Sequence, residues 1–171
     1  MPFPIAHAIT GASIVALSRR SVIISRDWIS LLVGALLAIS PDFDFFFVWF
    51  LGFGAAWHRS FTHSIFFALA VGILTSWMAG QLRIRECLVY ASTVISHILL
   101  DFLTSKTMAG VEMLWPFCAC RFKLGLFNYI DVDLNAHSSF GFAVGLLKIS
   151  LIELLVLSPF FTLIIFLKKP H

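Results

Sequence analysis

The chain has 171 residues, of which 60% are hydrophobic and only 12% are charged, and its mean hydropathy is +0.96. A soluble domain of this length exposes too much surface to hide so many apolar side chains, so the composition excludes a soluble domain. It predicts a single membrane-embedded domain over residues 1–171. The net charge of +3 does not indicate nucleic acid, because the basic residues lie in short clusters beside apolar runs, as membrane topology signals do.

Six apolar segments are candidates for membrane helices, since about 20 apolar residues cross the ~30 Å hydrocarbon core. In chain order they are residues 5–18, 28–40, 43–57, 64–80, 87–104 and 142–167. The first two are short, and at ~1.5 Å per residue they reach only about 20 Å. The expected fold is therefore all-α, a multi-pass transmembrane bundle of four to six membrane segments.

The basic clusters predict an orientation, because cytoplasmic loops are enriched in Lys and Arg. If the first helix runs inward, three clusters lie inside: Arg19, Arg20 and Arg26, then Arg83 and Arg85, then Lys168 and Lys169. Four basic residues lie outside: Arg59, Lys106, Arg121 and Lys123. This arrangement requires residues 43–57 to remain on the outer side as a re-entrant or interfacial hairpin. If they span instead, the acids before them and the histidines after them lie on opposite faces.

An ionisable residue inside a membrane segment costs about 2.5 kcal/mol or more, so it is functional by default. His97 and Asp101 are four residues apart and share one face of the predicted helix 87–104. Imidazole and carboxylate together suit Zn²⁺, Mn²⁺ or Fe²⁺. The structural alternative is a His–Asp hydrogen bond that only satisfies two buried groups.

His58 and His63 are five residues apart, just before the predicted helix 64–80, so a turn must bring them together. Arg59 between them has the planar guanidinium suited to a phosphate or carboxylate, and we expect it to bind the substrate's anion. The structural alternative is an interfacial loop that contacts lipid headgroups. Thr62 or Ser64 is available as the N-cap of the following helix.

Asp42 and Asp44 follow Pro41 in a D-x-D pattern that suits a metal site, with one carboxylate bridging metals or acting as general base. The alternative is that they favour the N-terminus of the next helix, and we expect one of them to cap it. His7, one helical turn before Gly11, is a possible seventh ligand, although a lone His near the N-terminus is more often structural.

Some candidates are weaker. They are Glu153, which we expect to pair with Lys148, and the loop residues Asp131, Asp133 and His137. Three cysteines are too few for a disulfide framework, and Cys118-x-Cys120 is interpreted as structural rather than as a metal motif. The stronger candidates gather at one predicted depth, at the outer face. They form a Cys-free set with excess oxygen ligands that opens on water, which favours a catalytic site over a structural zinc site.

Over residues 1–125 the order of the motifs resembles a known family. The motifs are His7-x-x-x-Gly11, Pro41-Asp42-x-Asp44, His58-Arg59-Ser60-x-Thr62-His63-Ser64, Ser96-His97-x-x-x-Asp101 and, after them, Leu114-Trp115-Pro116-Phe117. This is the family of membrane-bound metal-dependent hydrolases, first described as LexA-regulated proteins of the bacterial inner membrane. The ligand order is also distantly similar to zinc-dependent phospholipase C and the P1-type nucleases. That similarity implies phosphoester chemistry and two or three zinc ions.

The expected function is hydrolysis of a phosphoester of a lipid or lipid-linked substrate in the inner membrane, through a metal-activated water. The expected cofactor is a divalent metal, Zn²⁺ first and Mn²⁺ second, held by His7, Asp42, Asp44, His58, His63, His97 and Asp101. One alternative is a metal-ion or proton transporter that uses the same His and Asp cluster. Transporters usually contain two related halves, and no internal repeat stands out here. The other alternative is a membrane scaffold with vestigial ligands.

Overall fold

The computed structural model describes residues 4–19, 24–80, 82–104, 110–126 and 139–169. Its helices are α1 (Pro4–Ser18), α2 (Ile24–Ile39), α3 (Phe45–Trp49), α4 (Ile65–Met78), α5 (Ile84–Thr104) and α6 (Ser139–Leu167). Short 3₁₀ turns cover Ser40–Asp44, Ala55–Trp57 and Phe61–His63. Within the described ranges the only β pairing is an isolated bridge between Val111 and Phe122. The expectation of an all-α membrane bundle is confirmed.

Three stretches are long and apolar enough to cross a membrane: Asp27–Val48, Ile84–Thr104 and Leu147–Leu167. The first is longer than expected because α2 continues through the Ser40–Asp44 turn into α3. Helix α1 and helix α4 are apolar but shorter, with 15 and 14 residues. Helix α4 begins at Ile65 because Ser64, one of the two expected N-caps, accepts a hydrogen bond from the Phe67 amide (3.0 Å), and residues 61–63 form a separate turn.

Residues 43–57 form no membrane-spanning helix of their own, and the chain folds back after the candidate span ends at Val48. Helix α3 has only five residues, and the Phe53 amide reaches back to the Phe47 carbonyl (3.0 Å). Gly52 has φ +69°, a left-handed conformation that a residue with a Cβ adopts at a cost. The segment therefore behaves as the hairpin that the sequence orientation requires, and it returns the chain to the end where α2 stops.

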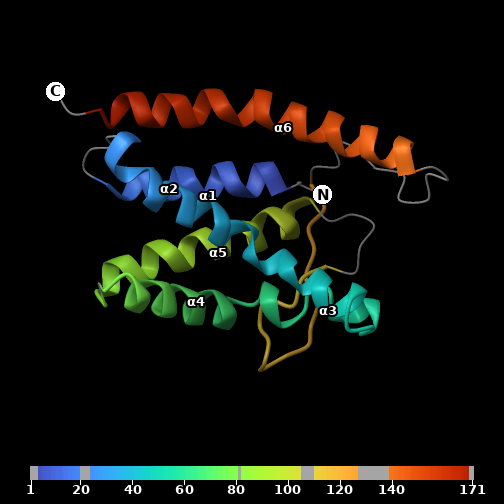
Figure 1. The fold of residues 1–171 in the computed structure, drawn as a ribbon. Coiled ribbons are helices and arrows are strands. Elements are labelled where there is room, and N and C mark those ends of the chain that lie inside the picture. The colour runs from blue at the N-terminus through green and yellow to red at the C-terminus, as the bar shows by residue number, and fades with distance from the viewer. Residues whose placement is uncertain (1–3, 20–23, 81, 105–109, 127–138, 170–171) are drawn as a thin grey trace.

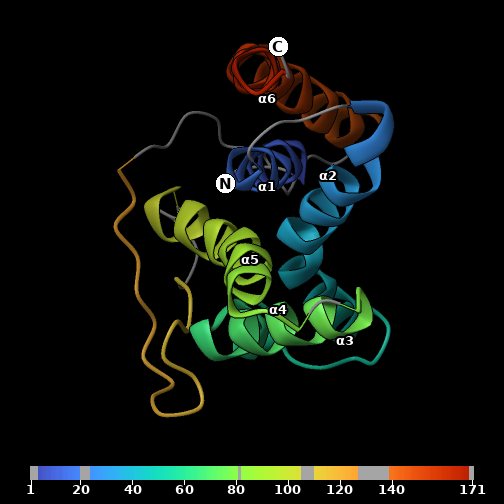
Figure 2. The same ribbon diagram turned by 90° about the vertical axis from the view of Figure 1, so that its left-hand side faces the viewer.

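The helices form layers with α6 on one side and α4 on the other (Figures 1 and 2). Helix α6 packs on α1, α1 packs on α2 and α5, and α5 packs on α4. Helices α1 and α2 cross closely at Gly11 and Gly34, where a Cβ on Gly11 would lie 2.3 Å from the Gly34 carbonyl oxygen. Small residues permit such an approach in membranes. This crossing lies one turn from His7 and brings it toward the end of α2.

Basic side chains gather at the opposite end of the bundle, around the C-terminus of α1. Lys168 donates to the carbonyls of Leu17 (3.1 Å) and Arg19 (2.9 Å), and Arg85 donates to the Ser18 carbonyl. Cations are favourable beside the negative end of a helix dipole. The bundle therefore has one basic end and, at its other end, the residues described next.

Candidate metal centre

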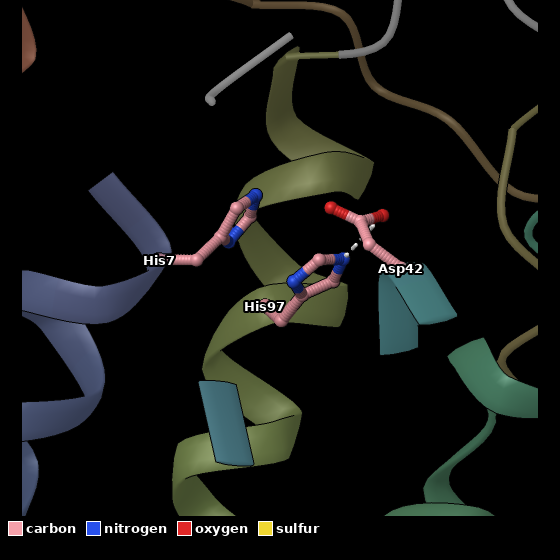
Figure 3. A group of neighbouring side chains, drawn as sticks. All are labelled: His7, Asp42 and His97. Atoms are coloured by element: carbon pink, nitrogen blue, oxygen red, sulfur yellow. Dashed lines mark ion pairs between the residues drawn. The ribbon is translucent and has the colours of Figure 1, made fainter. Parts of the chain in front are cut away.

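Seven side chains far apart in the sequence converge at one end of the bundle. His7 comes from the first turns of α1, the two acids from the Ser40–Asp44 turn, two histidines from the loop before α4, and two residues from the second half of α5. They are His7, Asp42, Asp44, His58, His63, His97 and Asp101. Figure 3 shows three of them, with His7, Asp42 and His97 pointing toward one another from three elements. These are the seven residues that the sequence proposed as ligands.

A tight loop brings His58 and His63 together despite their spacing. Arg59 has φ +64°, an uncommon conformation for a residue with a side chain, and such residues cluster at functional sites. The loop is held by Asp44, which accepts hydrogen bonds from the Arg59 amide (2.8 Å) and the Thr62 hydroxyl (3.1 Å). The ring centroids of His58 and His63 are 5.8 Å apart.

Hydrogen bonds fix the Nδ1 atoms of His58 and His97 as donors. His58 Nδ1 lies 2.8 Å from Asp44 Oδ1, and His97 Nδ1 lies 2.7 Å from the Ala38 carbonyl oxygen. Because those oxygens only accept, each Nδ1 carries the proton, and a neutral ring then keeps a lone pair on Nε2. This is the second-shell pattern that orients histidines bound to metals.

His63 has the same arrangement through Thr62. The Thr62 hydroxyl donates its hydrogen to Asp44, so it accepts from His63 Nδ1 at 3.1 Å. Burial lowers the pKa of His63 well below its ordinary value, and the nearby His97 lowers it further. A neutral His63 therefore also keeps its lone pair on Nε2, which is the form that binds metal.

The Nε2 atoms of His63 and His97 face each other at 3.1 Å. When both rings are neutral and both Nδ1 atoms donate, two lone pairs meet, and a cation between or beside them removes the repulsion. Carboxylates surround this pair: Asp42 Oδ1 lies 3.5 Å from His97 Nε2, and Asp101 Oδ2 lies 3.7 Å from His63 Nε2. Ligand atoms of one tetrahedral zinc at ~2.0–2.2 Å are about 3.3–3.6 Å apart, and the separations of 3.1, 3.5 and 3.7 Å lie close to this range.

Several buried polar atoms at the site make no hydrogen bond within the described residues. They are both ring nitrogens of His7, Oδ1 of Asp42 and Nε2 of His58. Leaving a buried polar group unpaired costs about 1–3 kcal/mol, so such atoms need an explanation, which a bound ion would supply. The side chains fall into three overlapping groups that could each hold one: His7, Asp42 and His97; His63, His97 and Asp101; Asp42, Asp44 and His58.

Access to the site is from the side of Asp42. Its side chain is 20% exposed and that of His58 is 11% exposed, whereas the other five candidate ligands are at most 1% exposed. His7 stacks on His97 with ring centroids 3.8 Å apart and closes the site toward α1.

Arg59 is buried more deeply than expected for a residue whose role is to bind a substrate's anion. It is 1% exposed, and its guanidinium lies 2.7 Å from Asp101 Oδ2. The arginine expected for the substrate's anion therefore pairs with a carboxylate of its own chain, which it orients toward His63.

The expectation that Asp42 or Asp44 caps a helix is wrong. No side chain caps the Ser40–Asp44 turn or α3, although Asp44 occupies the N-cap position of α3. The reason is that its carboxylate turns away from α3 and accepts from the loop of residues 58–62 instead.

Sequence analysis missed a supporting network around Glu112. Glu112 is buried and accepts from the Ser60 hydroxyl (2.7 Å) and from Arg121 Nε (3.0 Å), while its amide donates to the Arg59 carbonyl (3.0 Å). It thereby supports the strained turn at Arg59. Its position inside the apolar run Val111–Leu114 is a signal that could have identified it.

The weaker candidates lie elsewhere. Asp131, Asp133 and His137 fall outside the described residues. Glu153 is buried in α6 and accepts a hydrogen bond from the Ala6 amide (3.1 Å). Cys118 and Cys120 are paired in a disulfide, in agreement with a structural rather than a metal-binding role.

A family model described as "YdjM inner membrane protein" matches residues 1–171. The chain belongs to this family. The YdjM-family match spans the whole chain, so it includes all seven converging residues and the apolar helices that could cross the membrane. The protein is therefore a multi-pass protein of the inner membrane, as expected.

A curated relative agrees with this placement. The inner membrane protein YbcI of Escherichia coli (strain K12) is 38% identical over 102 residues, which cover 54% of this chain and 56% of the relative. The chain thus spans about half the length of the curated relative that it matches. No solved structure matches the chain.

Proposed function

We propose that the protein is a membrane-bound metal-dependent hydrolase that cleaves a phosphoester of a lipid or lipid-linked substrate. The observation that carries the proposal is the pair of facing Nε2 atoms of His63 and His97, 3.1 Å apart, with each Nδ1 committed to an oxygen acceptor. A neutral pair of this kind has no favourable contact unless a cation binds. Two further groups of potential ligands adjoin it, which supports a site for two or three divalent ions, Zn²⁺ first and Mn²⁺ second.

A divalent metal ion, when bound, supplies a hydroxide nucleophile at neutral pH and polarises the ester oxygen. The residues that would hold the metal are His63, His97, Asp101, His58 and His7. Among the carboxylates, Asp42 is the one exposed toward the opening, so it is suited to accept a proton from an attacking water. Asp44 is committed to three hydrogen bonds and positions the loop.

The charge of Arg59 supports an anionic substrate. A buried guanidinium beside the ligand Asp101 adds positive potential to the floor of the site. Together with the resemblance to phosphodiester-cleaving enzymes, this favours a phosphoester over a neutral ester.

A lipid substrate is supported by the apolar surface beside the opening. The hairpin that directly follows Asp42 exposes bulky side chains: Phe43, Phe46, Phe50, Leu51, Phe53 and Trp57. Such residues place a segment at the membrane interface, where a lipid headgroup meets its acyl chains. A substrate with an acyl tail could therefore reach Asp42 without leaving the membrane.

The outer face of the membrane is the proposed side of the site. The basic residues Arg19, Arg85 and Lys168 lie at the other end of the bundle, as positive-inside topology requires. The Cys118–Cys120 disulfide lies in the segment that packs on the site's loop, and disulfides persist in the periplasm but are rare in the cytoplasm.

The test is metal content followed by hydrolysis. The full chain is purified gently in detergent, bound metals are counted by elemental analysis, and phosphate release is followed with phosphatidic-acid-type lipids in mixed vesicles. We expect divalent metal in the wild type, and loss of both metal and phosphate release in His97→Ala. Ser92→Ala is the matched control, because Ser92 is exposed on the same helix α5 and its hydroxyl donates to a helix carbonyl, that of Leu88 (2.7 Å).

Other outcomes contradict the proposal. Bound metal without hydrolysis, together with metal uptake into liposomes, would indicate a transporter. A wild-type chain without metal, and no difference between His97→Ala and wild-type cells, would indicate a scaffold.

A further inference from the structure

Two charged side chains, Glu153 of α6 and Lys168 just after it, contact the two ends of α1. Near the start of α1, Glu153 accepts a hydrogen bond from the Ala6 amide (3.1 Å), and near its end Lys168 donates to the Leu17 and Arg19 carbonyls. Glu153 on α6 and Lys168, which directly follows α6, are 15 residues apart, and α1 is 15 residues long. At ~1.5 Å per residue both lengths are about 22 Å, so the stretch from Glu153 to Lys168 is as long as α1.

The signs of the two charges suit the ends of α1. The first amides of a helix lack partners within the helix, and a carboxylate is favourable there, whereas a cation is favourable at the last carbonyls. The first turn of α1 has no acidic residue of its own. Glu153 supplies that carboxylate from 147 positions away, and it is only 3% exposed within the candidate membrane span Leu147–Leu167. A carboxylate is costly at this depth, so its presence needs a reason.

The turn of α1 that Glu153 holds also carries His7. His7 follows Ala6 directly, and its ring stacks on His97 while its Nε2 lies 3.8 Å from Asp101 Oδ1. Neither ring nitrogen of His7 makes a hydrogen bond within the described residues. No hydrogen bond within the described residues therefore anchors the His7 side chain, and the backbone of its turn must fix its place.

We propose that Glu153 is a positioning residue of the metal centre, which holds the first turn of α1 so that His7 lies against His97 and Asp101. This inference rests on the proposed function, because it assumes that the position of His7 serves metal binding. It also gives α6, which packs chiefly on α1 and lies on the far side of the bundle from α4, a direct connection to the site (Figure 1).

The experiment compares Glu153→Leu, Glu153→Gln, His7→Ala and the double variant His7→Ala/Glu153→Leu in the full chain. Zn²⁺ affinity is measured by competition with a chromogenic chelator, and Co²⁺ is substituted so that its visible spectrum reports the ligand set. Hydrogen exchange of the peptide covering residues 4–11 is followed in the metal-free protein. Lys168→Met is the control, since it removes the α6 contact at the other end of α1.

Glu153→Leu is expected to weaken Zn²⁺ binding about tenfold. This is the lower end of the loss in metal affinity that follows mutation of a residue that orients metal ligands. Its Co²⁺ spectrum should change as that of His7→Ala does, and exchange in residues 4–11 should rise. Glu153→Gln keeps an oxygen acceptor and should restore all three readouts. The double variant should bind no more weakly than His7→Ala, because two residues that act through one contact are not additive. Lys168→Met should leave metal binding unchanged.

The inference is overturned if Glu153→Leu retains the wild-type spectrum and affinity, or if its loss adds to that of His7→Ala. Unchanged exchange in residues 4–11 of Glu153→Leu also overturns it, and this readout needs no metal. A wild-type chain that binds neither Zn²⁺ nor Co²⁺ instead overturns the proposed function.

Discussion

At the scale of single residues, Asp44 connects most of the candidate site. Its carboxylate accepts from His58 Nδ1, from the Arg59 amide and from the Thr62 hydroxyl, and Thr62 in turn accepts from His63. One buried acid thus fixes the tautomers of two histidines and the strained turn between them. Carboxylates in this position also raise the basicity of a ligating imidazole.

Asp44→Asn is therefore expected to weaken Zn²⁺ binding about 10- to 100-fold, because an amide cannot accept at both of its polar atoms and carries no charge. The measurement is chelator competition on the purified full chain. Asp27→Asn, in the first turn of α2 at the other end of that helix, is the control and should bind like the wild type. A Kd for Asp44→Asn within about twofold of the wild type would show that the acid does not organise the ligands.

At the scale of the elements, the crossing of α1 and α2 sets the position of His7. The helices meet at Gly11 and Gly34, where the backbone of one lies against the backbone of the other. A Cβ on Gly11 would also lie 2.5 Å from Ala38 Cβ, and Ala38 is the residue whose carbonyl holds His97. The glycine in the pattern His7-x-x-x-Gly11 therefore has a packing role.

Gly11→Ala is expected to push α1 from α2, because the nearest atoms belong to backbone that cannot give way cheaply. We expect a loss of about 1–3 kcal/mol, typical of overpacking, and thus a lower Tm. For a chain of this size each kcal/mol corresponds to about 2–4 °C. Thermal unfolding in detergent is the measurement.

Gly54→Ala is the matched control for this prediction. Gly54 is exposed in the hairpin, and a Cβ there meets nothing within 4 Å. It should unfold at the wild-type temperature. Equal melting temperatures for Gly11→Ala and the wild type would contradict the close crossing.

At the scale of the whole molecule, the bundle has two chemically different ends. One gathers the seven potential ligands and the aromatic hairpin, and the other gathers Arg19, Arg85 and Lys168 around the end of α1. Because α6 ends beside this basic cluster, the location of its C-terminus reports which way the site faces.

A reporter fused after residue 171 should lie in the cytoplasm. A fluorescent protein fused there should fluoresce, and alkaline phosphatase, which requires disulfides formed in the periplasm, should be inactive. The two reporters must give opposite answers in the same cells for the assignment to stand. Active phosphatase would place the C-terminus outside, and the candidate site would then face the cytoplasm.

The sequence by itself determined the solvent and the residues that converge. Sixty per cent apolar residues require a membrane, and each ionisable side chain among them is costly enough to stand out, so the pattern named all seven converging residues. The orientation predicted from the basic clusters needed residues 43–57 to stay on the outer side, but the sequence left open whether this segment spans or re-enters. These inferences rest on composition and local spacing, which do not depend on how the helices pack.

Only the tertiary structure decided what those residues contact. The capping role expected for Asp42 or Asp44 is absent because Asp44 binds a loop 14 to 18 residues away, and Arg59 meets Asp101, 42 residues away, before any substrate. Glu112 and Glu153 acquire their roles through Ser60 and Ala6, partners 52 and 147 residues distant. A hydrogen bond depends on a few tenths of an ångström between side chains, and helix packing, which no local pattern encodes, sets those distances.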